Sequence, residues 1–283
     1  MLTVRVAVVG SLNHDVAVWV PRRPQPDETM HGSRVEEYAG GKGANQAVAA
    51  ARLEAEVTMV GCVGTDGRGK FLLSELDAAG VNRTHVSRVD TSTGIAVITI
   101  DPDDVSIVVV AGANGELNRQ RVEAAATEIA SADVLLLQGE VAAEASRTAA
   151  LLAAASSTLV VFNPAPFNEV ASQVLPLADV VVVNQYEAEQ LGDVHPSVLV
   201  TTLGADGCEV RVNQETTQVD APKVEVIDPT GAGDAFVGAF AVALVETGDP
   251  IAAAAIAVRA GAVAVGVAGA QPGMPTWQDI DGV

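Results

Sequence analysis

The stretch with the clearest chemical potential is "VIDPTGAGDAFVGAF", Val226–Phe240. The small residues Gly231 to Gly233 precede one acid, Asp234, and an apolar, Ala-rich run follows. The pattern predicts a helix that begins near Gly231, after an extended segment. The first amides of such a helix have no partner inside the helix, so together they form a site for an anion such as phosphate. The glycines let the backbone approach that anion closely.

Asp234 falls in the first turn of this expected helix. A carboxylate beside an incoming phosphate repels it, so Asp234 is poorly explained as a group that binds the anion. It is well suited to act as a general base for a hydroxyl that attacks phosphorus. The alternative is a capping acid on a core helix, because Asp is common at such positions. This motif alone leaves both interpretations open.

Two familiar nucleotide-binding patterns do not fit the sequence. A dinucleotide fingerprint needs a third Gly where Phe236 stands, and "GSLNHD", which follows the first expected strand, holds no Gly-x-Gly. A Walker A loop needs Ser or Thr after its Lys, but Gly43 follows Lys42 in "AGGKGAN". The sequence therefore argues against a Rossmann cofactor site and against a P-loop.

Two further segments carry groups suited to a sugar. "EYAGGKGANQAVAAARL" (36–53) opens another expected helix, with Asn45 in its first turn. "GSLNHD" (10–15) places Asn13 and Asp15 just past the first strand, where alternation of side chains puts both on one face. Carboxamide and carboxylate oxygens accept hydrogen bonds from sugar hydroxyls. The structural alternatives are a capped helix in the first segment and an Asx turn in the second.

Polar residues also follow three later strands: Glu140 in "LLLQGE", Asn163 in "FNPAP", and Asn184 with Glu187 in "VVVNQYEAE". The carboxyl ends of parallel strands meet at one edge of a sheet, where α/β folds bind ligands. Asn184 and Glu187, three residues apart at a helix start, could hold a hydrated Mg²⁺ together with phosphates. Each of these residues could instead be a plain helix cap.

The elements that would position these residues alternate along the chain. Near-continuous apolar runs predict parallel strands buried on both faces, at Val4–Val9, Val57–Val60, Val134–Leu137, Leu159–Phe162, Val180–Val183 and Val198–Thr202. Helical patterns lie at Ala44–Leu53, Gly67–Ala79, Arg119–Ala130, Ala143–Ala155 and Gln185–Leu191. This alternation predicts a doubly wound α/β fold, with a mostly parallel central sheet and helices on both faces.

Two pairs of short strands interrupt the alternation. Asp15–Val20 with Arg34–Tyr38, and Ile95–Asp101 with Ser106–Val110, have hairpin patterns. We expect them to form a small β-sheet lid, from about 14–38 and 94–110. The connection after Leu191 is too short for a covering helix. We find no linker or repeat, so we expect one domain over residues 1–283.

The composition argues against several kinds of partner and bears on where the protein is located. The formal net charge of −20 argues against binding to nucleic acid or to an anionic membrane surface. Two cysteines, Cys62 and Cys208, are too few for a zinc site or a disulfide framework. The most apolar segment, Ile251–Val267, carries Arg259 and predicts a buried helix. The amino terminus lacks a signal-peptide pattern, so we expect a cytoplasmic protein.

Taken together, these motifs resemble the ribokinase-like (PfkB) family of carbohydrate kinases over nearly the whole chain. The resemblance is carried by "GSLNHD", "GGKGANQAVAAARL", "GCVGTDGRG", "AGANGEL", "NPAP", "NQYEAEQL", "TLGADG", "DPTGAGDAF" and "GAQPGMP", in the family's order and spacing. Asp234 resembles the family's catalytic base, and Gly231, Ala232 and Gly233 resemble its anion hole. The implied sugar site consists of Asn13, Asp15, Gly41, Lys42, Asn45, Glu140 and Asp234.

The same resemblance implies sites for the nucleotide and for cations. The resemblance implies that the nucleotide is bound by Asn184, Thr202, Gly204 and Gly207. It also implies that Glu187 holds Mg²⁺ through water. A monovalent cation, usually K⁺ in the family, would be held largely by backbone carbonyls at Asp228, Thr230, Ala264, Gly269 and Gly273. The lid resembles one that often pairs two subunits, which implies a homodimer.

The activity expected from this resemblance is transfer of the γ-phosphoryl group of ATP to O5 of D-ribose, giving ribose 5-phosphate. One alternative is a different substrate of the same family, such as deoxyribose, a hexose or a nucleoside. Another is a non-catalytic sugar-binding regulator. The chain departs from many ribose-specific members at Gly231, where they have Ala, and at Ala235, where they have Thr.

Overall fold

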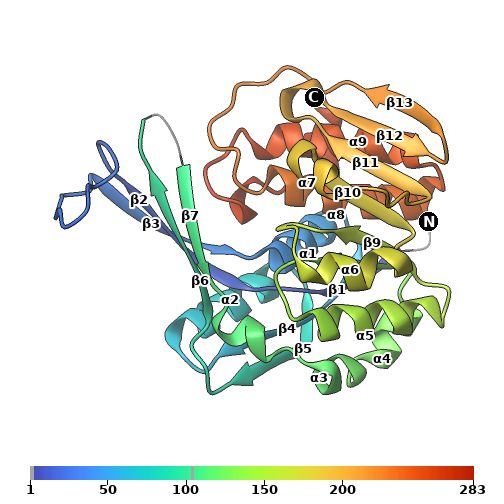
Figure 1. Cartoon of the computed structure of the whole chain (residues 1–283), viewed down its shortest axis with the longest axis horizontal. Coiled ribbons are helices and arrows are strands. Elements are labelled where there is room, and N and C mark those ends of the chain that lie inside the picture. Colours follow the sequence, from blue (N-terminus) through green and yellow to red (C-terminus); the bar gives the residue numbers. More distant parts are fainter. Residues whose placement is uncertain (1–2, 103–104) are drawn as a thin grey trace.

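Two sheets organise the chain in the computed structural model, which describes residues 3–102 and 105–283 (Figure 1). The large sheet consists of β1 (Arg5–Val9), β4 (Glu56–Gly64), β5 (Asn82–Val89), β8 (Val134–Gln138), β9 (Leu159–Asn163), β10 (Val180–Asn184), β11 (Val198–Thr202), β12 (Cys208–Val212) and β13 (Glu215–Val219). The small sheet consists of β2 (Asn13–Trp19), β3 (Arg34–Gly40), β6 (Gly94–Ile100) and β7 (Val105–Val110).

The helices are α1 (Lys42–Arg52), α2 (Gly67–Ala78), α3 (Arg119–Glu123), α4 (Ala126–Ser131), α5 (Ala143–Ala154), α6 (Glu169–Val174), α7 (Gln185–Gln190), α8 (Ala232–Thr247), α9 (Pro250–Ala264) and α10 (Trp277–Asp281). Short 3₁₀ turns are η1 (Gly112–Glu116), η2 (Leu175–Leu177), η3 (Gly204–Asp206) and η4 (Gln271–Gly273).

The large sheet is doubly wound, as the sequence predicts. Its strand order is β13-β12-β11-β10-β9-β8-β1-β4-β5, and the run from β11 to β5 is parallel throughout. The central parallel strands are buried on both faces: in β1, Val6 and Val8 join the core beneath α1, α8 and α9, while Ala7 and Val9 join the core beneath α5 and α6. This two-sided burial explains why the strands lack a polar face.

The direction of winding reverses beside β1. From β1 the chain proceeds outward to β4 and β5, then returns to β8 on the other side and proceeds to β11. A crevice opens at the carboxyl ends of the strands where the order reverses, and α/β sheets bind ligands there. The residues that follow β1 and β8, among them Asn13 and Glu140, are therefore placed at this crevice.

The small sheet projects from one side of the main body, at the left of Figure 1. Its strand order is β3-β2-β6-β7, with β2–β3 and β6–β7 antiparallel, as the hairpin patterns predict. The two hairpins are joined by parallel pairing of β2 with β6, which the sequence did not indicate. Residues 103–104, within the expected lid segment, lie outside the described residues. We call these four strands the lid.

Several elements differ from the sequence-based predictions. The expected helix Arg119–Ala130 is two short helices, α3 and α4, separated where Ala125 leaves helical geometry at φ −104° and ψ 17°. Strands β5, β12 and β13 and helix α6 were not predicted. The three strands lie toward the two ends of the large sheet and mix polar with apolar residues, so they lack the apolar runs that mark the central strands.

The connection after α7 and the apolar helical segment agree with the sequence-based predictions. The segment between α7 and β11 holds neither helix nor strand. Helix α9 covers most of the apolar segment predicted to be a helix, and it packs against α8. No helix in the described part of the chain is both long and apolar enough to cross a bilayer. Cys62 and Cys208 are buried and unpaired, and burial raises the pKa values of their thiols to about 11 and about 12.

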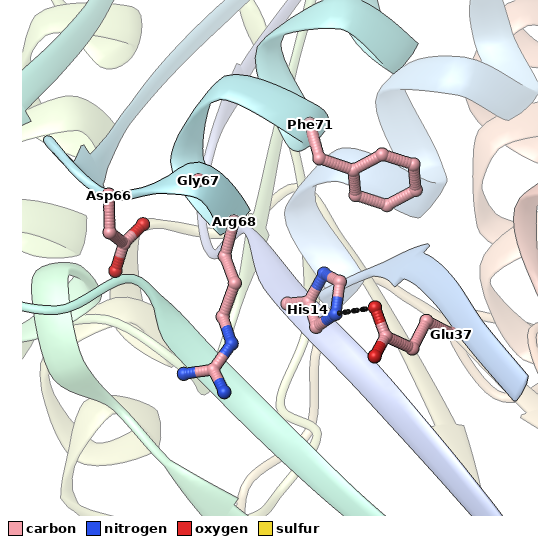
Figure 2. A pocket seen from close by; sticks show the side chains of 6 residues that line it. All are labelled: His14, Glu37, Asp66, Gly67, Arg68 and Phe71. Carbon is pink, nitrogen blue, oxygen red and sulfur yellow. Dashed lines mark hydrogen bonds and ion pairs between the residues drawn. The ribbon is translucent and has the colours of Figure 1, made fainter. Parts of the chain in front are cut away.

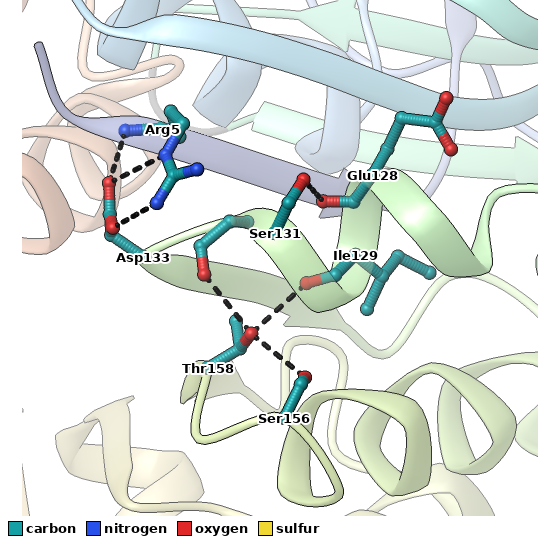
Figure 3. A network of polar contacts seen from close by, with 8 residues as sticks. Arg5, Glu128, Ile129, Ser131, Asp133, Ser156 and Thr158 are labelled. Carbon is teal, nitrogen blue, oxygen red and sulfur yellow. Dashed lines mark hydrogen bonds and ion pairs between the residues drawn. The ribbon is translucent and has the colours of Figure 1, made fainter.

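Polar contacts at the opposite, amino-terminal edge of the sheet are structural (Figure 3). The Arg5 backbone and guanidinium donate to the Asp133 carboxylate at 2.8 and 2.9 Å. The Thr158 hydroxyl lies 3.1 Å from the carbonyl oxygens of Ile129 and Ala132, at the end of α4. These contacts tie helix ends to strand starts, and they leave the carboxyl edge as the place for ligand chemistry.

Candidate active site

The centre of the carboxyl edge is Asp234, in the first turn of α8 and 6% exposed. Its two carboxylate oxygens accept hydrogen bonds from α1: Oδ2 from Asn45 Nδ2 at 2.9 Å and Oδ1 from Gln46 Nε2 at 3.1 Å. Helix α8 has no side-chain cap, and its N-cap residue is Gly231. The capping alternative for Asp234 is therefore not what the structure contains.

Close packing of α1 against α8 makes these contacts possible. A Cβ on Gly238 would lie 2.6 Å from the Ala49 Cβ and 2.9 Å from the Gln46 carbonyl oxygen, so only Gly lets the two helices approach this closely. The Asn45 Oδ1 atom is buried without a partner among the described residues. A buried acceptor of this kind is suited to a hydroxyl of a bound ligand.

Asn13 and Asp15 lie on one face of β2, as alternation predicts, and not in an Asx turn. Both are buried, at 3% and 7% exposure. Gly40 and Gly94 make room for them, because a Cβ on Gly40 would collide with the Asp15 carboxylate and one on Gly94 would lie 2.5 Å from Asn13 Oδ1. Asn13 Oδ1 accepts from Asn114 Nδ2 at 2.7 Å, which anchors the start of the lid.

A second corner of the site forms around Glu140, just past β8. Its Oε2 atom accepts hydrogen bonds from the backbone amide of Lys42, at 3.1 Å, and from the Ser11 hydroxyl. Gly41 has φ +89°, and a Cβ there would lie 2.6 Å from the backbone nitrogen of Asn13. The tight turn at Gly41 therefore brings the start of α1 against the start of β2.

The charges in this crevice perturb one another. The pKa of Asp15 is raised to about 7: burial is the largest cause, the nearby charges of Glu140 and Asp234 add to it, and Lys42 acts in the opposite direction. Burial also disfavours the charged form of Lys42, but the carboxylates, Asp234 first and then Glu140, outweigh it and raise the pKa of Lys42. Carboxylates with one lysine suit a neutral ligand rich in hydroxyl donors.

The backbone at the start of α8 is partly exposed, from half-buried Gly231 and Ala232 to exposed Gly233. Ala232 donates to the Pro229 carbonyl oxygen at 3.3 Å, whereas the amides of Gly231 and Gly233 have no acceptor within residues 3–102 and 105–283. A Cβ on Gly233 would meet nothing within 4 Å. Gly231 has φ +82° and lies against Ala270, where a Cβ would be 2.7 Å from its methyl group. This backbone favours Gly at position 231, and it leaves a cradle that fits an anion.

The segments expected to bind nucleotide lie side by side at the ends of β10 and β11, where Asn184 pairs in register with Thr202. Asn184 and Glu187 form a capping box: Asn184 Oδ1 accepts from the Glu187 amide at 2.8 Å, and Glu187 Oε2 accepts from the Asn184 amide at 2.9 Å. Gly204 and Gly207, with φ +61° and +89°, shape the turn from β11 to β12.

In the capping box only Oε2 of Glu187 accepts a hydrogen bond from the Asn184 amide. Burial raises its pKa, against the Asn184 hydrogen bond and the Lys42 charge, which lower it. Across the described residues, no group of three His, Cys, Asp or Glu side chains could ligate a metal directly. The donor set therefore fits a Mg²⁺ ion held through water and phosphate oxygens better than one held by a protein cage.

The five positions expected to hold a monovalent cation gather beside α8. Asp228 Oδ1 accepts from the Thr230 amide at 2.9 Å, and Asp228 Oδ2 accepts from the Gly269 amide at 2.8 Å. A Cβ on Gly273 would lie 2.7 Å from the Ala264 carbonyl oxygen. The Asp228 amide donates to Val265, the residue after Ala264, which links the two groups. These contacts bring the five positions together, and backbone carbonyl oxygens are donors that a hard cation prefers.

A cavity of about 520 Å³ lies on the other face of the lid strand β2 (Figure 2). It is lined by His14, Glu37, Asp66, Gly67, Arg68 and Phe71. His14 Nε2 lies 3.0 Å from Glu37 Oε2, and the ring meets Phe71 edge-on. Because His14 alternates with Asn13 and Asp15 along the strand, this cavity is separate from the crevice around Asp234.

The fold and the site define an α/β enzyme of the ribokinase-like class. Residues 4–277 match the pfkB family of carbohydrate kinases. The chain is 36% identical to the ribokinase of Bacillus subtilis over 98% of both chains. It superposes on the ribokinase of Thermotoga maritima with TM-score 0.89 and 30% identity, over 99% and 98% of the two chains. The ribokinase of Arabidopsis thaliana complexed with ribose and ATP gives TM-score 0.88 and 28% identity, over 99% and 98%.

The chain belongs to the pfkB family of carbohydrate kinases. It is an enzyme that transfers a phosphoryl group to a hydroxyl of a carbohydrate.

Four polar residues of the crevice escaped sequence-based prediction: Ser11, Gln46, Asn114 and Gln138. All are buried. Each lies next to or inside a quoted motif, but polar residues in such segments are usually exposed, and nothing in their spacing marks them as partners. Asn163, noted as a candidate because it follows a strand, accepts from Gln46 and lies behind Asp234.

Proposed function

We propose that this kinase transfers the γ-phosphoryl group of ATP to O5 of D-ribose. The observation that carries the proposal is Asp234, a buried carboxylate held by two amides beside the open cradle at the start of α8. A base and an anion site placed together suit the attack of a hydroxyl on phosphorus. The ribokinase names of the relatives, and the ribose and ATP bound to one of them, favour ribose and ATP as substrates.

In this proposal the sugar lies between the start of the lid and the start of α1. Asn13, Asp15, Asn45 and Glu140 accept its hydroxyl hydrogens, and the Gly41–Lys42 turn closes one side of the site. Asp234 takes the proton of O5 as the oxygen attacks. The amides of Gly231, Ala232 and Gly233 stabilise the negative charge on the transferring group, and preorganised donors of this kind contribute strongly to catalysis.

The nucleotide and its cations occupy the adjoining edge. Asn184, Thr202, Gly204 and Gly207 would line the nucleotide, and Glu187 would hold Mg²⁺ through water, where the ion neutralises the phosphates. A K⁺ ion would lie among the backbone oxygens of Asp228, Thr230, Ala264, Gly269 and Gly273. It would add positive charge behind the anion cradle in a chain whose net charge is −20. A cytoplasmic location, where ATP is supplied, stays a prediction.

A coupled ADP-release assay over ribose, deoxyribose, fructose and adenosine tests the substrate. We expect ribose to have the highest kcat/KM, K⁺ to raise it over Na⁺, and removal of Mg²⁺ by EDTA to abolish turnover. Mass and NMR spectra of the product should show phosphate on O5. Turnover of another member of the panel, without turnover of ribose, would replace ribose as the substrate.

We also propose that two copies of this chain pair through the lid. Strand β7 is an edge strand with one neighbour, β6, and its side chains are exposed on both faces, with Ile107 at 56% and Val108 at 63%. Val35 on the opposite edge strand, β3, is 60% exposed. A lid that closes on the sugar with one face leaves the other apolar face for a second copy, because exposed apolar edges otherwise promote aggregation.

Sedimentation velocity at micromolar concentration tests the pairing. We expect the wild-type chain to sediment as a dimer and Val108→Lys as a monomer, because the strand register places Val108 on the face opposite Asp15, and a charge on the paired face must be desolvated. Leu151→Lys, which changes an equally apolar and 42% exposed residue on α5, is the matched control and should remain dimeric. A monomeric wild-type chain, or a dimeric Val108→Lys, contradicts pairing through the lid.

A further inference from the structure

Gln46 is a buried polar residue that the proposed mechanism does not yet use. It is 0% exposed in α1, one residue after Asn45. Its Nε2 donates to Asp234 Oδ1 at 3.1 Å and lies 3.3 Å from Asn163 Oδ1. Its Oε1 accepts from Gln138 Nε2 at 2.7 Å, and Gln138 is also 0% exposed. Side chains from β8, α1 and β9 thus converge behind Asp234.

The direction of every amide in this chain of contacts follows from one backbone carbonyl. Val182 O can only accept, so Asn163 must present Nδ2 to it, at 2.9 Å. Asn163 Oδ1 therefore faces Gln46 as an acceptor, and Gln46 must present its NH₂ group. The Gln46 oxygen is then left for Gln138 Nε2. No amide in the series can turn over without losing a buried hydrogen bond.

The fixed orientation of these amides leaves one acceptor, at Gln138, unpaired within residues 3–102 and 105–283. Gln138 Oε1 is buried without a partner among the described residues, and it lies where a Cβ on Gly10 would collide with it. An unpaired buried acceptor is unfavourable. In this arrangement Asp234 receives a hydrogen bond from Gln46, and the unpaired acceptor lies at Gln138, away from the carboxylate.

We propose that Gln46 is the positioning residue for the Asp234 base, and that Gln138 and Asn163 hold Gln46 in that role. This inference rests on the proposed function. Because Gln46 is 0% exposed, it acts on the reaction only through Asp234. Its N–H and that of Asn45 fix one direction for each carboxylate oxygen, which aims the remaining lone pairs toward the sugar. A hydrogen bond donated to a carboxylate favours its ionised form, so loss of the Gln46 N–H disfavours that form.

Gln46→Met tests the role, because Met has a similar length and no N–H donor. We expect kcat to fall about 10- to 100-fold while the KM for the sugar changes less than about threefold, since Asp234 is the only residue of the proposed sugar site that loses a hydrogen bond. The acid limb of the kcat–pH profile should move to higher pH. The other charged groups that act on this crevice, Asp15 and Glu140 and the single Lys42, are unchanged in the variant.

Two further variants keep the test decisive. Thr158→Val removes buried hydrogen bonds at the opposite edge of the sheet, so it should lower the melting temperature without moving the pH profile. If Gln46→Met does not fold, Gln46→Asn retains an amide but is one methylene too short to reach Asp234, and it should give the same shift. A kcat within about threefold of wild type with an unmoved acid limb, in whichever variant folds, overturns the inference.

The test of Gln46 does not depend on which sugar the enzyme phosphorylates. If the enzyme phosphorylates another sugar, the ribose assignment fails, and the same variants are compared on that sugar. Gln46 would then still be expected to move kcat and the acid limb together. Conversely, normal ribose turnover with an unchanged Gln46→Met profile would leave the proposed function intact and remove only the positioning role.

Discussion

Asp234→Asn is expected to lower kcat by about 10²- to 10⁴-fold, the contribution typical of a general base. Asn has the shape of Asp but cannot take a proton at the operating pH. It should fit the site, because Gln46 can donate to the new carbonyl oxygen while Asn45, whose Oδ1 has no partner among the described residues, can turn over to accept from the new NH₂. Folding and sugar binding should therefore be largely retained.

Single-turnover kinetics and calorimetric titration of ribose measure the two quantities separately. Ribose affinity should stay within about tenfold, because Asn keeps the shape of Asp234 and, among the other sugar contacts, only Asn45 changes its orientation. Asp133→Asn is a matched control: it makes the same chemical change at the amino edge of the sheet, where Asp133 pairs with Arg5, and it should leave kcat unaltered. A kcat near that of wild type in Asp234→Asn would rule out the base assignment.

Asp15→Asn is expected to weaken ribose binding and to stabilise the free protein at the same time. Loss of a hydrogen bond to a charged acceptor should raise the KM for ribose about 10- to 100-fold. The stability effect follows from the pKa of Asp15, which is raised to about 7 in the folded state. Burial is the largest cause of this shift, and the charges of Glu140 and Asp234 add to it. In the unfolded chain the same carboxyl has a pKa of about 4.

The direction of the pH dependence of stability follows from the number of protons bound in the folded and unfolded states. Between pH 4 and pH 7 the folded state holds the proton and the unfolded state does not, so the free energy of unfolding falls as pH rises through this window. Above pH 7 the buried charge destabilises the fold in full. Removing the charge with Asn should raise the free energy of unfolding at pH 8 by on the order of 2–4 kcal/mol, and this gain should vanish near pH 4.

Urea unfolding at pH 8 and pH 4 measures this change. Asp66→Asn is the control of opposite sign: burial raises the pKa of Asp66, but hydrogen bonds from Thr93 and Gly69 outweigh it and lower the pKa, so the variant should lose stability at pH 8. If Asp15→Asn is destabilised at pH 8, or if its ribose KM is unchanged, Asp15 is not a strained sugar ligand.

Much of the architecture could be predicted because local signals were strong. The apolar runs of β1, β8 and β10 are buried on both faces, and such strands are recognisable from composition alone. The hairpin β12–β13 and the strand β5 were not predicted, because only four of their 18 residues are fully buried and their sequences lack a continuous apolar run. The hairpins of the lid were visible, whereas the β2–β6 pairing that unites them joins segments about 80 residues apart.

The sequence by itself determined the doubly wound fold, the lid hairpins, the kinase family and the placement of Asp234 just after a glycine-containing turn. The fold and the hairpins follow from periodicity, the turn follows from glycines whose positions are local, and the family follows from the resemblance of whole motifs. Only the tertiary structure decided that Asn45 and Gln46 hold Asp234, that Ser11 joins Glu140, and that Asp15 is buried among like charges. Those contacts join residues more than 90 positions apart, and their strength depends on burial, which no local pattern encodes.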